Sequence, residues 1–212
     1  MKRVLPYLFT AVVALVCGAA ILFFGLKLSG RSGAERFLFG RTETENSAGQ
    51  ERSRAVDLAL EAAGALKDGD FEALSQMVHP SRGLLFTPYS TVNLTSDRWF
   101  TASEVADLGG DEQRYTWGMS PVTGSVLEMT ARDFLSGVVY DYDYVSAPVI
   151  SLNYIAARGN ALENVSEAFP DAVFVDLHNP GTDGRWTTLR LVFENQDGDL
   201  WLVAVIHCQY TV

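Results

Sequence analysis

The sequence is poor in the residues that most often carry stability or chemistry by themselves. It holds two cysteines, three histidines and 16 basic residues against 26 acidic ones in 212 residues. Cys17 lies in an apolar N-terminal run and Cys208 near the C-terminus, so we expect no disulfide within a folded domain. Such a domain must be stabilised by its apolar core, and cysteine usage does not identify its compartment.

Basic residues are especially scarce beyond the N-terminus. Residues 1–31 carry four basic and no acidic residues, so residues 32–212 hold 12 basic and 26 acidic ones, a net charge of −14. A domain of this charge repels a phosphate backbone, which argues against nucleic acid as a partner. It also offers no polybasic patch for anionic lipids.

Motifs for catalysis, cofactors and metals are missing as well. There is no G-x-S-x-G turn and no glycine-rich phosphate loop. The histidines show no H-x-x-H or H-x-x-x-H spacing, which argues against zinc. The two aspartates of "DYDY" (141–144) lack the further oxygen ligands of a calcium loop and predict a solvated turn. The sequence therefore predicts no cofactor and no metal site.

One long hydrophobic run is present, at the N-terminus. "MKRVLPYLFTAVVALVCGAAILFFGLKL" opens with two basic residues, and the 23 residues 4–26 carry no charge. About 20 residues span a hydrocarbon core, whereas the apolar part of a signal peptide has about 7–15 and precedes a small-residue cleavage site. We therefore predict an uncleaved transmembrane signal anchor at residues 1–28. The alternatives are a cleaved signal peptide and a lipid on Cys17, although Val16 replaces the small residue of a lipobox.

The rest of the chain is expected to follow this anchor as a tether and one domain. The short charged tail before the run favours an N-terminus inside, which predicts a single-pass protein of the cell membrane with its domain on the extracytoplasmic side. Residues 29–53 are rich in Gly, Ser, Glu and Arg and predict a flexible tether. Residues 54–212 then form an extracytoplasmic domain of ordinary size.

The pattern of this domain indicates helices first and long strands last. Apolar residues at 56, 59, 60, 63 and 66 follow a helical period. Asp70, Thr101 and Thr130 are typical N-caps, and Thr101 forms a capping-box pattern with Glu104. Three strands close the chain, the last two joined by the hairpin sequence "NQDGD". This order predicts an α+β fold with helices packed on a curved antiparallel sheet. Further helices are predicted at 130–140 and 160–170, and further strands at 82–93, 113–119 and 147–157.

The segment "AVDLALEAAGALKDGDFEALSQMVHP" (55–80) resembles the opening of the nuclear-transport-factor-2-like, cystatin-like cone fold, in which "DGDFEAL" joins a long and a short helix. The segments "VHPSRGLLFTPYSTVN", "PDAVFVDLHNPGTDGRWTTLRLVFE" and "WLVAVIHCQYTV" resemble a family of uncharacterised bacterial secreted proteins and lipoproteins. The resemblance covers residues 54–212 and implies a cone of helices on a curved sheet and an extracytoplasmic location. It implies no chemistry, because this fold serves isomerases, dehydratases and binding modules alike.

The last strand places polar side chains inside an apolar run. With a period of two, Cys208 lies on the face opposite His207. The face of His207 is then expected to carry Trp201, Val203, Val205 and Gln209. A face that is apolar first and polar at its end is typical of a pocket mouth, which we predict here.

Neighbouring strands add charged groups. Asp176 and Arg190 are expected to form a cross-strand ion pair on an exposed sheet face. His207 with Asp176 or His178 could act as an acid–base pair, so the catalytic candidates are His207 and Asp176. The competing interpretation is that His207 and Gln209 bond loop backbone. The binding candidates are His79, Arg82, Tyr89, His178, Arg190 and Gln209.

Since no catalytic motif is present, we predict a membrane-anchored extracytoplasmic module that binds a small ligand or an envelope protein. The alternative is a small hydrolase or isomerase that uses His207 and Asp176. A third hypothesis is a structural homodimer formed through the sheet face.

Overall fold

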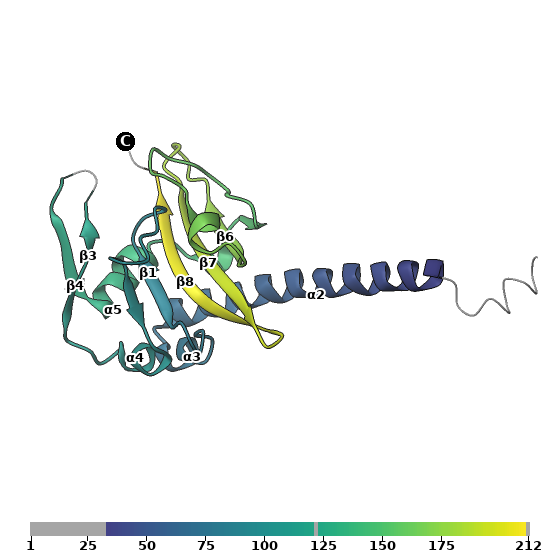
Figure 1. Ribbon diagram of the computed structural model, residues 1–212. Helices are drawn as coiled ribbons and strands as arrows, with labels where there is room; N and C mark the ends of the chain where they lie inside the picture. The colour runs from purple at the N-terminus through teal and green to yellow at the C-terminus, as the bar shows by residue number, and fades with distance from the viewer. Residues whose placement is uncertain (1–32, 121–122, 211–212) are drawn as a thin grey trace, which may run out of the picture. The chain divides into compact units, whose positions relative to one another are not determined.

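The computed structural model describes residues 33–120 and 123–210 (Figure 1). The chain divides into two compact units, Met1–Gln50 and Glu51–Val212, and every strand of the described residues lies in the second. The membrane anchor predicted at residues 1–28 lies outside the described residues. Within the described part of the chain, no helix combines the length and the apolar character that crossing a membrane requires.

The first described helix, α2, runs over Gly33–Asp68. Its backbone is helical well before the start predicted near residue 54, through most of the segment predicted as an irregular tether. That segment contains no proline and several good helix formers, so its composition is compatible with a helix. The helix ends where predicted, at Gly69, whose φ of 65° suits a residue without a side chain.

Six strands form one curved sheet in the order β2-β1-β8-β7-β6-β5. β1 pairs parallel with β8, and the other neighbours pair antiparallel. The sheet is therefore mixed, which corrects the antiparallel prediction. No hairpin joins β1 to β8, so no local pattern fixes their relative direction. The strands span Leu84–Thr87 (β1), Arg98–Phe100 (β2), Val149–Leu152 (β5), Val173–Asn179 (β6), Thr187–Gln196 (β7) and Asp199–Gln209 (β8).

A separate hairpin and short helices complete the domain. The strands β3 (Arg114–Met119) and β4 (Val126–Thr130) form the hairpin. The predicted caps are confirmed: the side chains of Asp70, Thr101 and Thr130 accept hydrogen bonds from backbone N–H groups of the following turn. The helices are α3 (Phe71–Ser75), α4 (Ala102–Asp107), α5 (Ala131–Phe134), the π-helical turn η1 (Leu135–Val139), the 3-10 turn η2 (Tyr144–Ser146) and α6 (Val165–Ala168).

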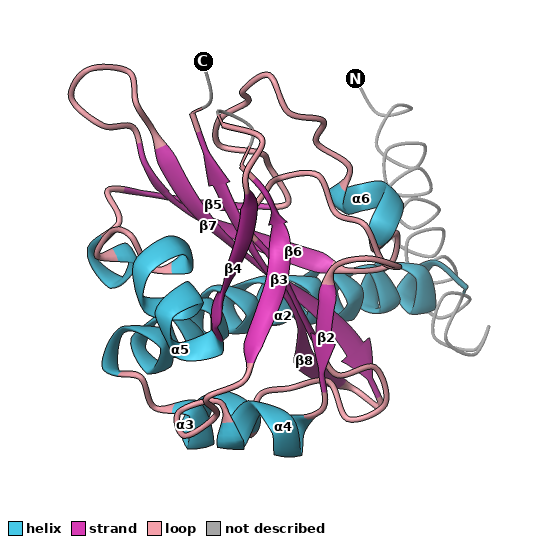
Figure 2. Cartoon of the chain, turned by 90° about the vertical axis from the view of Figure 1, so that its left-hand side faces the viewer, coloured by secondary structure: helices cyan, strands magenta, loops and turns pink. Residues whose placement is uncertain are grey.

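Two apolar cores lie on opposite faces of the sheet. We call the first the helix-side core, because part of α2 and the adjacent α5 pack into it (Figure 2). Here the indole of Trp117 in β3 stacks on Phe134 of α5, with ring centroids 3.8 Å apart. The helix-side core includes Ala59, Ala63, Phe134, Tyr144, Leu189, Leu191, Leu202 and Val205. The other, the loop-side core, includes Leu85, Phe169, Phe174, Val192, Val203, Ala204, Ile206 and Cys208.

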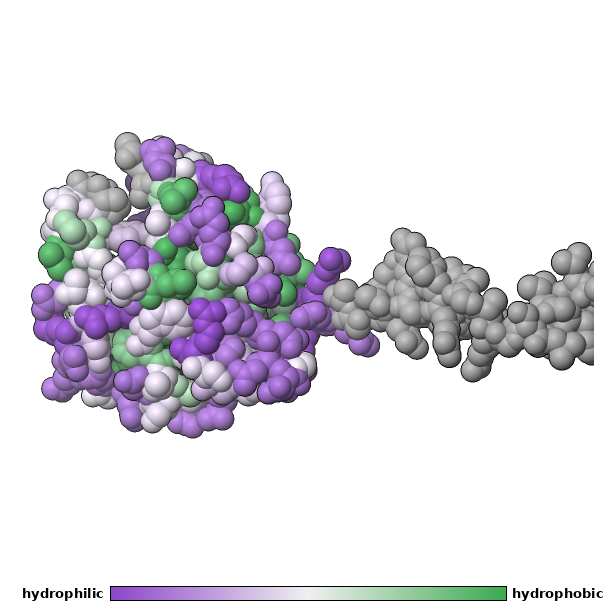
Figure 3. Space-filling view, viewed as in Figure 1, coloured by the Kyte–Doolittle hydropathy of each residue, from purple (hydrophilic) through white to green (hydrophobic). Residues whose placement is uncertain are grey.

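A bulge in β8 changes which residues share a face. Val192 of β7 pairs with Ala204, but the next residue, Phe193, pairs with Leu202, so Val203 is an extra residue in β8. Leu202 therefore joins Val205 on the helix side, whereas Val203 lies in the loop-side core. This corrects the predicted face of His207, which shares its side with Leu202 and not with Val203. The surface in view is mostly hydrophilic, with small hydrophobic patches (Figure 3).

Candidate functional site

The residues selected from the sequence do not converge on one pocket. They divide into three groups: one around Glu194, one around Arg190 on the loop side of the sheet, and one around His207 on the helix side. Tyr89 lies apart, since its hydroxyl donates to the carbonyl of Met119 at 2.6 Å. Gln209 is exposed at the end of β8.

His79 and Arg82 are brought together by Glu194 of β7. The guanidinium of Arg82 pairs with the carboxylate of Glu194 and lies over the rings of Trp99 and Phe169. His79 Nδ1 accepts hydrogen bonds from the backbone N–H groups of Ser81 and Arg82 at 3.2 and 3.1 Å. These contacts hold the turn before β1 against the sheet. The side chains of His79 and Arg82 therefore already have partners within the protein.

Arg190 and Asp176 form the predicted cross-strand pair. Arg190 Nε and Nη2 donate to the two carboxylate oxygens of Asp176 at 2.6 and 3.0 Å, and Nη1 donates to Glu163 at 2.6 Å. The prediction of an exposed ion pair was wrong, because both side chains are completely buried. The loop after β5 covers them, and within it Ala156 donates its N–H to Asp176 at 3.0 Å.

His178 lies on the same loop-side face as this ion cluster, where its Nδ1 and the hydroxyl of Thr188 are 2.7 Å apart. Burial lowers the pKa of His178, which favours the neutral imidazole. Burial likewise raises the pKa of the Cys208 thiol and leaves it protonated. Neither group therefore offers the charge or the nucleophile of a catalytic site at neutral pH.

His207 pairs with Asp141, not with Asp176. Its Nε2 lies 3.2 Å from Asp141 Oδ1 and 3.1 Å from the hydroxyl of Thr187. Asp176 is on the opposite face of the sheet. It lies opposite Arg190 of β7, whereas His207 lies opposite Leu189, the residue before Arg190. Neighbouring residues of a strand point to opposite faces, so His207 and Asp176 do as well. The predicted acid–base pair of His207 and Asp176 is thus excluded by the strand register.

A tyrosine closes the network around Asp141. The hydroxyl of Tyr144 donates to Asp141 at 2.5 Å and lies 2.6 Å from the Thr187 hydroxyl. Burial opposes the charge of Asp141, but hydrogen bonding to His207 and its charge, together with the hydrogen bonds from Tyr144 and Thr187, outweigh burial and lower the pKa of Asp141. Burial and the same carboxylate raise the pKa of Tyr144. His207 Nδ1 is buried and makes no hydrogen bond to any described residue. The sequence signal for this partner is "DYDY", and the prediction of a solvated turn there is wrong for Asp141, which contacts Tyr144 and His207.

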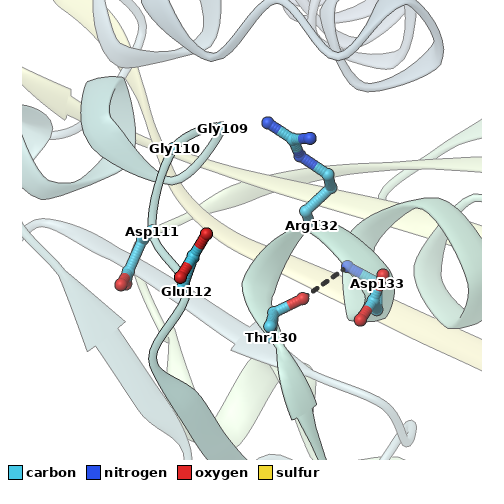
Figure 4. Close-up of a pocket in the computed structure, with 7 residues that line it drawn as sticks. All are labelled: Gly109, Gly110, Asp111, Glu112, Thr130, Arg132 and Asp133. Atoms are coloured by element: carbon cyan, nitrogen blue, oxygen red, sulfur yellow. Dashed lines mark hydrogen bonds between the residues drawn. The ribbon is translucent and has the colours of Figure 1, made fainter.

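A groove that the sequence did not indicate lies around Arg132. A cavity of 360 Å³ opens between the turn after α4 and the start of α5 (Figure 4). A second cavity, of 330 Å³, shares Gly109 and Arg132 with the first and reaches Lys67 and Ser136. We call the two together the Arg132 groove. The first cavity is lined by Gly109, Gly110, Asp111, Glu112, Thr130, Arg132 and Asp133.

The charged side chains of this groove differ in how far they are engaged. Asp111 accepts hydrogen bonds from the Tyr115 hydroxyl at 2.6 Å and from the backbone N–H of Gln113 at 2.8 Å. Arg132 reaches toward the Gly109–Gly110 turn, and Glu112 points into the same space (Figure 4). Neither the guanidinium nor the Glu112 carboxylate has a hydrogen bond or ion pair with any residue that the structure describes. Among the described residues, the groove therefore presents one unpaired cation, Arg132, and three unpaired carboxylates, those of Asp68, Glu112 and Asp133.

No cluster of three or more His, Cys, Asp or Glu residues with metal-binding geometry occurs within residues 33–120 and 123–210. The His207 network has one carboxylate and one imidazole, too few ligands for zinc or calcium by itself.

No family model matches this sequence, and no curated protein is significantly similar to it. Among solved structures, a protein described as a calcium/calmodulin-dependent protein kinase II association domain from Xanthomonas campestris is similar, with a TM-score of 0.34 and 12% identity. The match covers 74% of this chain and 85% of that one. A likeness at this TM-score establishes neither a family nor a function. The class that the chain's own topology defines is an α+β protein with a curved mixed sheet and few helices.

Proposed function

We propose that this chain is a membrane-anchored, extracytoplasmic binding module that takes a small polar ligand in the Arg132 groove. The groove carries the proposal, because its two adjoining cavities of 360 and 330 Å³ fall within the size range of small-molecule sites, about 300–1,000 Å³. The candidates in the other groups are already engaged with partners inside the protein.

The chemistry of the groove defines the ligand class. An arginine fork binds carboxylate or phosphate oxygens through two parallel hydrogen bonds, and a carboxylate such as Glu112 binds an amine. Arg132 and Glu112 do not pair with each other, so a ligand that carries both an acidic and an amino group would satisfy both. Small zwitterions such as amino acids and short peptides have this combination.

The location rests on the sequence. The 23 uncharged residues 4–26 support an anchor, and the short charged tail before them favours a domain on the extracytoplasmic side. The order of a long helix, a Gly-Asp turn, a short helix and then a sheet supports the finer proposal of a nuclear-transport-factor-2-like cone and of kinship with bacterial secreted proteins. The proposed partners are the membrane, through the N-terminal helix, and a small ligand.

The test is calorimetric titration of the purified chain with a panel of amino acids, dipeptides and simple carboxylates. We expect at least one zwitterion to bind, and Arg132→Ala to weaken its binding about tenfold or more, since a charge-assisted contact is lost. Arg158→Ala is the matched control, because Arg158 is exposed and lies outside the groove. If no member of the panel binds, or if both variants lose affinity equally, the proposed site is wrong.

One observation favours a second function, an acid–base enzyme. His207 Nε2 lies 3.2 Å from Asp141 Oδ1, and an imidazole oriented by a carboxylate is a common general base. Asp141→Asn would keep the shape of the network and remove the carboxylate charge. A hydrolase or isomerase activity that is found and survives this substitution unchanged would exclude the His207 pair as its source.

A further inference from the structure

The edge of the sheet at β5 is short and follows Pro148, but it lacks the charges that most often keep edge strands apart. Residues 145–157, which include β5, contain no charged side chain, and Val149 and Ile150 are each 41% exposed. Natural edges are usually protected by lysine or other charges, by proline, by short length, by bulges or by a covering segment. The opposite edge, β2, has only three residues, and its Arg98 donates to the carbonyl of Thr116 in the β3–β4 hairpin at 3.3 Å.

The strand register shows which backbone groups of β5 point outward. The N–H of Asn153 donates to the carbonyl of Phe174 in β6 at 2.8 Å. Hydrogen-bonded and non-hydrogen-bonded pairs alternate along an antiparallel ladder, so Ser151 and Val149 also turn their N–H and C=O groups toward β6. Ile150 and Leu152 then turn theirs away from the sheet, and among the described strands β5 has no further neighbour.

We propose that a second copy of this chain occupies this edge, with β5 pairing antiparallel to β5 of the partner subunit about a two-fold axis at Ser151. In this register Ile150 of each copy meets Leu152 of the other, and each such pair exchanges both N–H···O bonds. Every outward backbone group of Ile150 and Leu152 thereby gains a partner, so the strand is self-complementary.

The β5 edge is a place where two copies can meet in spite of their charge, and its register makes it complementary to itself. The protein has a net charge of −10, so two copies repel through most of their surfaces. The β5 edge is uncharged and brings no like charges face to face. Its exposed neighbours Tyr154 and Val145, at 69% and 40% exposure, would add apolar contact around the joined strands. The contact does not involve the Arg132 groove, so the two proposals stand or fall separately.

The two-fold axis provides a sharp test by cross-linking. Ser151 would face Ser151 of the partner subunit in a non-hydrogen-bonded pair, where Cα atoms are about 4.5 Å apart, within the range that a disulfide bridges. In the full-length chain carrying Cys17→Ser, we expect Ser151→Cys to give a disulfide-linked dimer under mild oxidation. Val149→Cys is the matched control, because it would face residue 153 of the other copy and lie about 13 Å from its own counterpart.

Light scattering on the full-length chain in detergent tests the assembly without cysteines. We expect a dimer for the unaltered chain and a monomer for Ile150→Pro at the same concentration. That proline removes an outward N–H and no bond to β6, so the circular dichroism spectrum should be unchanged. Ile150→Lys should also give a monomer, by placing like charges at the joint. A monomeric unaltered chain, or equal cross-linking of Ser151→Cys and Val149→Cys, would overturn the proposal.

Discussion

Replacing Arg190 by methionine should destabilise the protein more than any comparable change at its surface. The guanidinium makes hydrogen bonds of 2.6 and 3.0 Å to Asp176 and of 2.6 Å to Glu163, and the three side chains are 2% exposed or less. Without it, two carboxylates remain buried with no positive partner. Removing one member of a buried pair costs about 3–5 kcal/mol. Because two carboxylates depend on this arginine, we expect the free energy of unfolding to fall by about 5 kcal/mol. For a domain of this size, that corresponds to about 10–20 °C in Tm.

The assay is urea unfolding of the purified protein, followed by tryptophan fluorescence. Arg54→Met is the matched control, because Arg54 makes a 2.9 Å ion pair with Asp199 in which both side chains are more than half exposed. That pair should contribute about 1 kcal/mol or less. Adding Asp176→Asn and Glu163→Gln to Arg190→Met removes the unpaired charges and should restore most of the loss. If Arg190→Met and Arg54→Met lower the unfolding free energy equally, the reasoning from burial is refuted.

Three further predictions concern glycines and acid stability. Gly64→Ala should raise the unfolding free energy by about 0.5–1 kcal/mol, because the residue is in α2 and an added Cβ meets nothing within 4 Å. Gly83→Ala should lower it by more than about 1 kcal/mol, since φ is +81° and the Cβ would lie 2.5 Å from the carbonyl oxygen of Phe100. The pKa of Asp141 is lowered when folded, because its contacts with His207, Tyr144 and Thr187 together outweigh burial. Asp141 therefore contributes stability above about pH 4, which is lost as the pH falls through its folded pKa. Thermal melts of Asp141→Asn should show a weaker loss of stability between about pH 4 and pH 2 than those of the unaltered protein. A steeper loss would contradict the sign of this pKa shift.

The sequence predicted those elements whose signals are local. The caps at Asp70, Thr101 and Thr130 each depend on residues within one turn, and all three are present. The meander β6–β7–β8 was predicted because its strands are long and joined by short connections. The strands β2 and β4 were not predicted, since three to five residues with mixed burial leave no period to detect. The helical conformation of residues 33–53 was not predicted, because a polar segment that contains glycine is equally compatible with a flexible tether.

The partners of the candidate residues were beyond the reach of the sequence. Asp176 and Arg190 were paired correctly, because neighbouring strands fix their register, but their burial depends on the loop that carries Glu163. Asp141 meets His207 across a separation of 66 positions, and no spacing rule connects such residues. The Arg132 groove likewise joins the turn after α4 to the start of α5, two segments whose proximity follows from packing alone.

The bulge at Val203 determines how the sheet separates its two buried ionic sites. Before it, the even-numbered Leu200 and Leu202 face the helix-side core; after it, the odd-numbered Val205 does. If the strand ran through Val203 with regular alternation and no bulge, either the first pair or Val205 would turn to the other side, leaving apolar volume unfilled in one core. The same shift turns His207 toward Asp141 and away from Asp176. By accommodating Val203, the bulge thus keeps the helix-side core continuous and leaves the His207 network and the Arg190 cluster on opposite faces, where neither can supply a proton or a charge directly to the other.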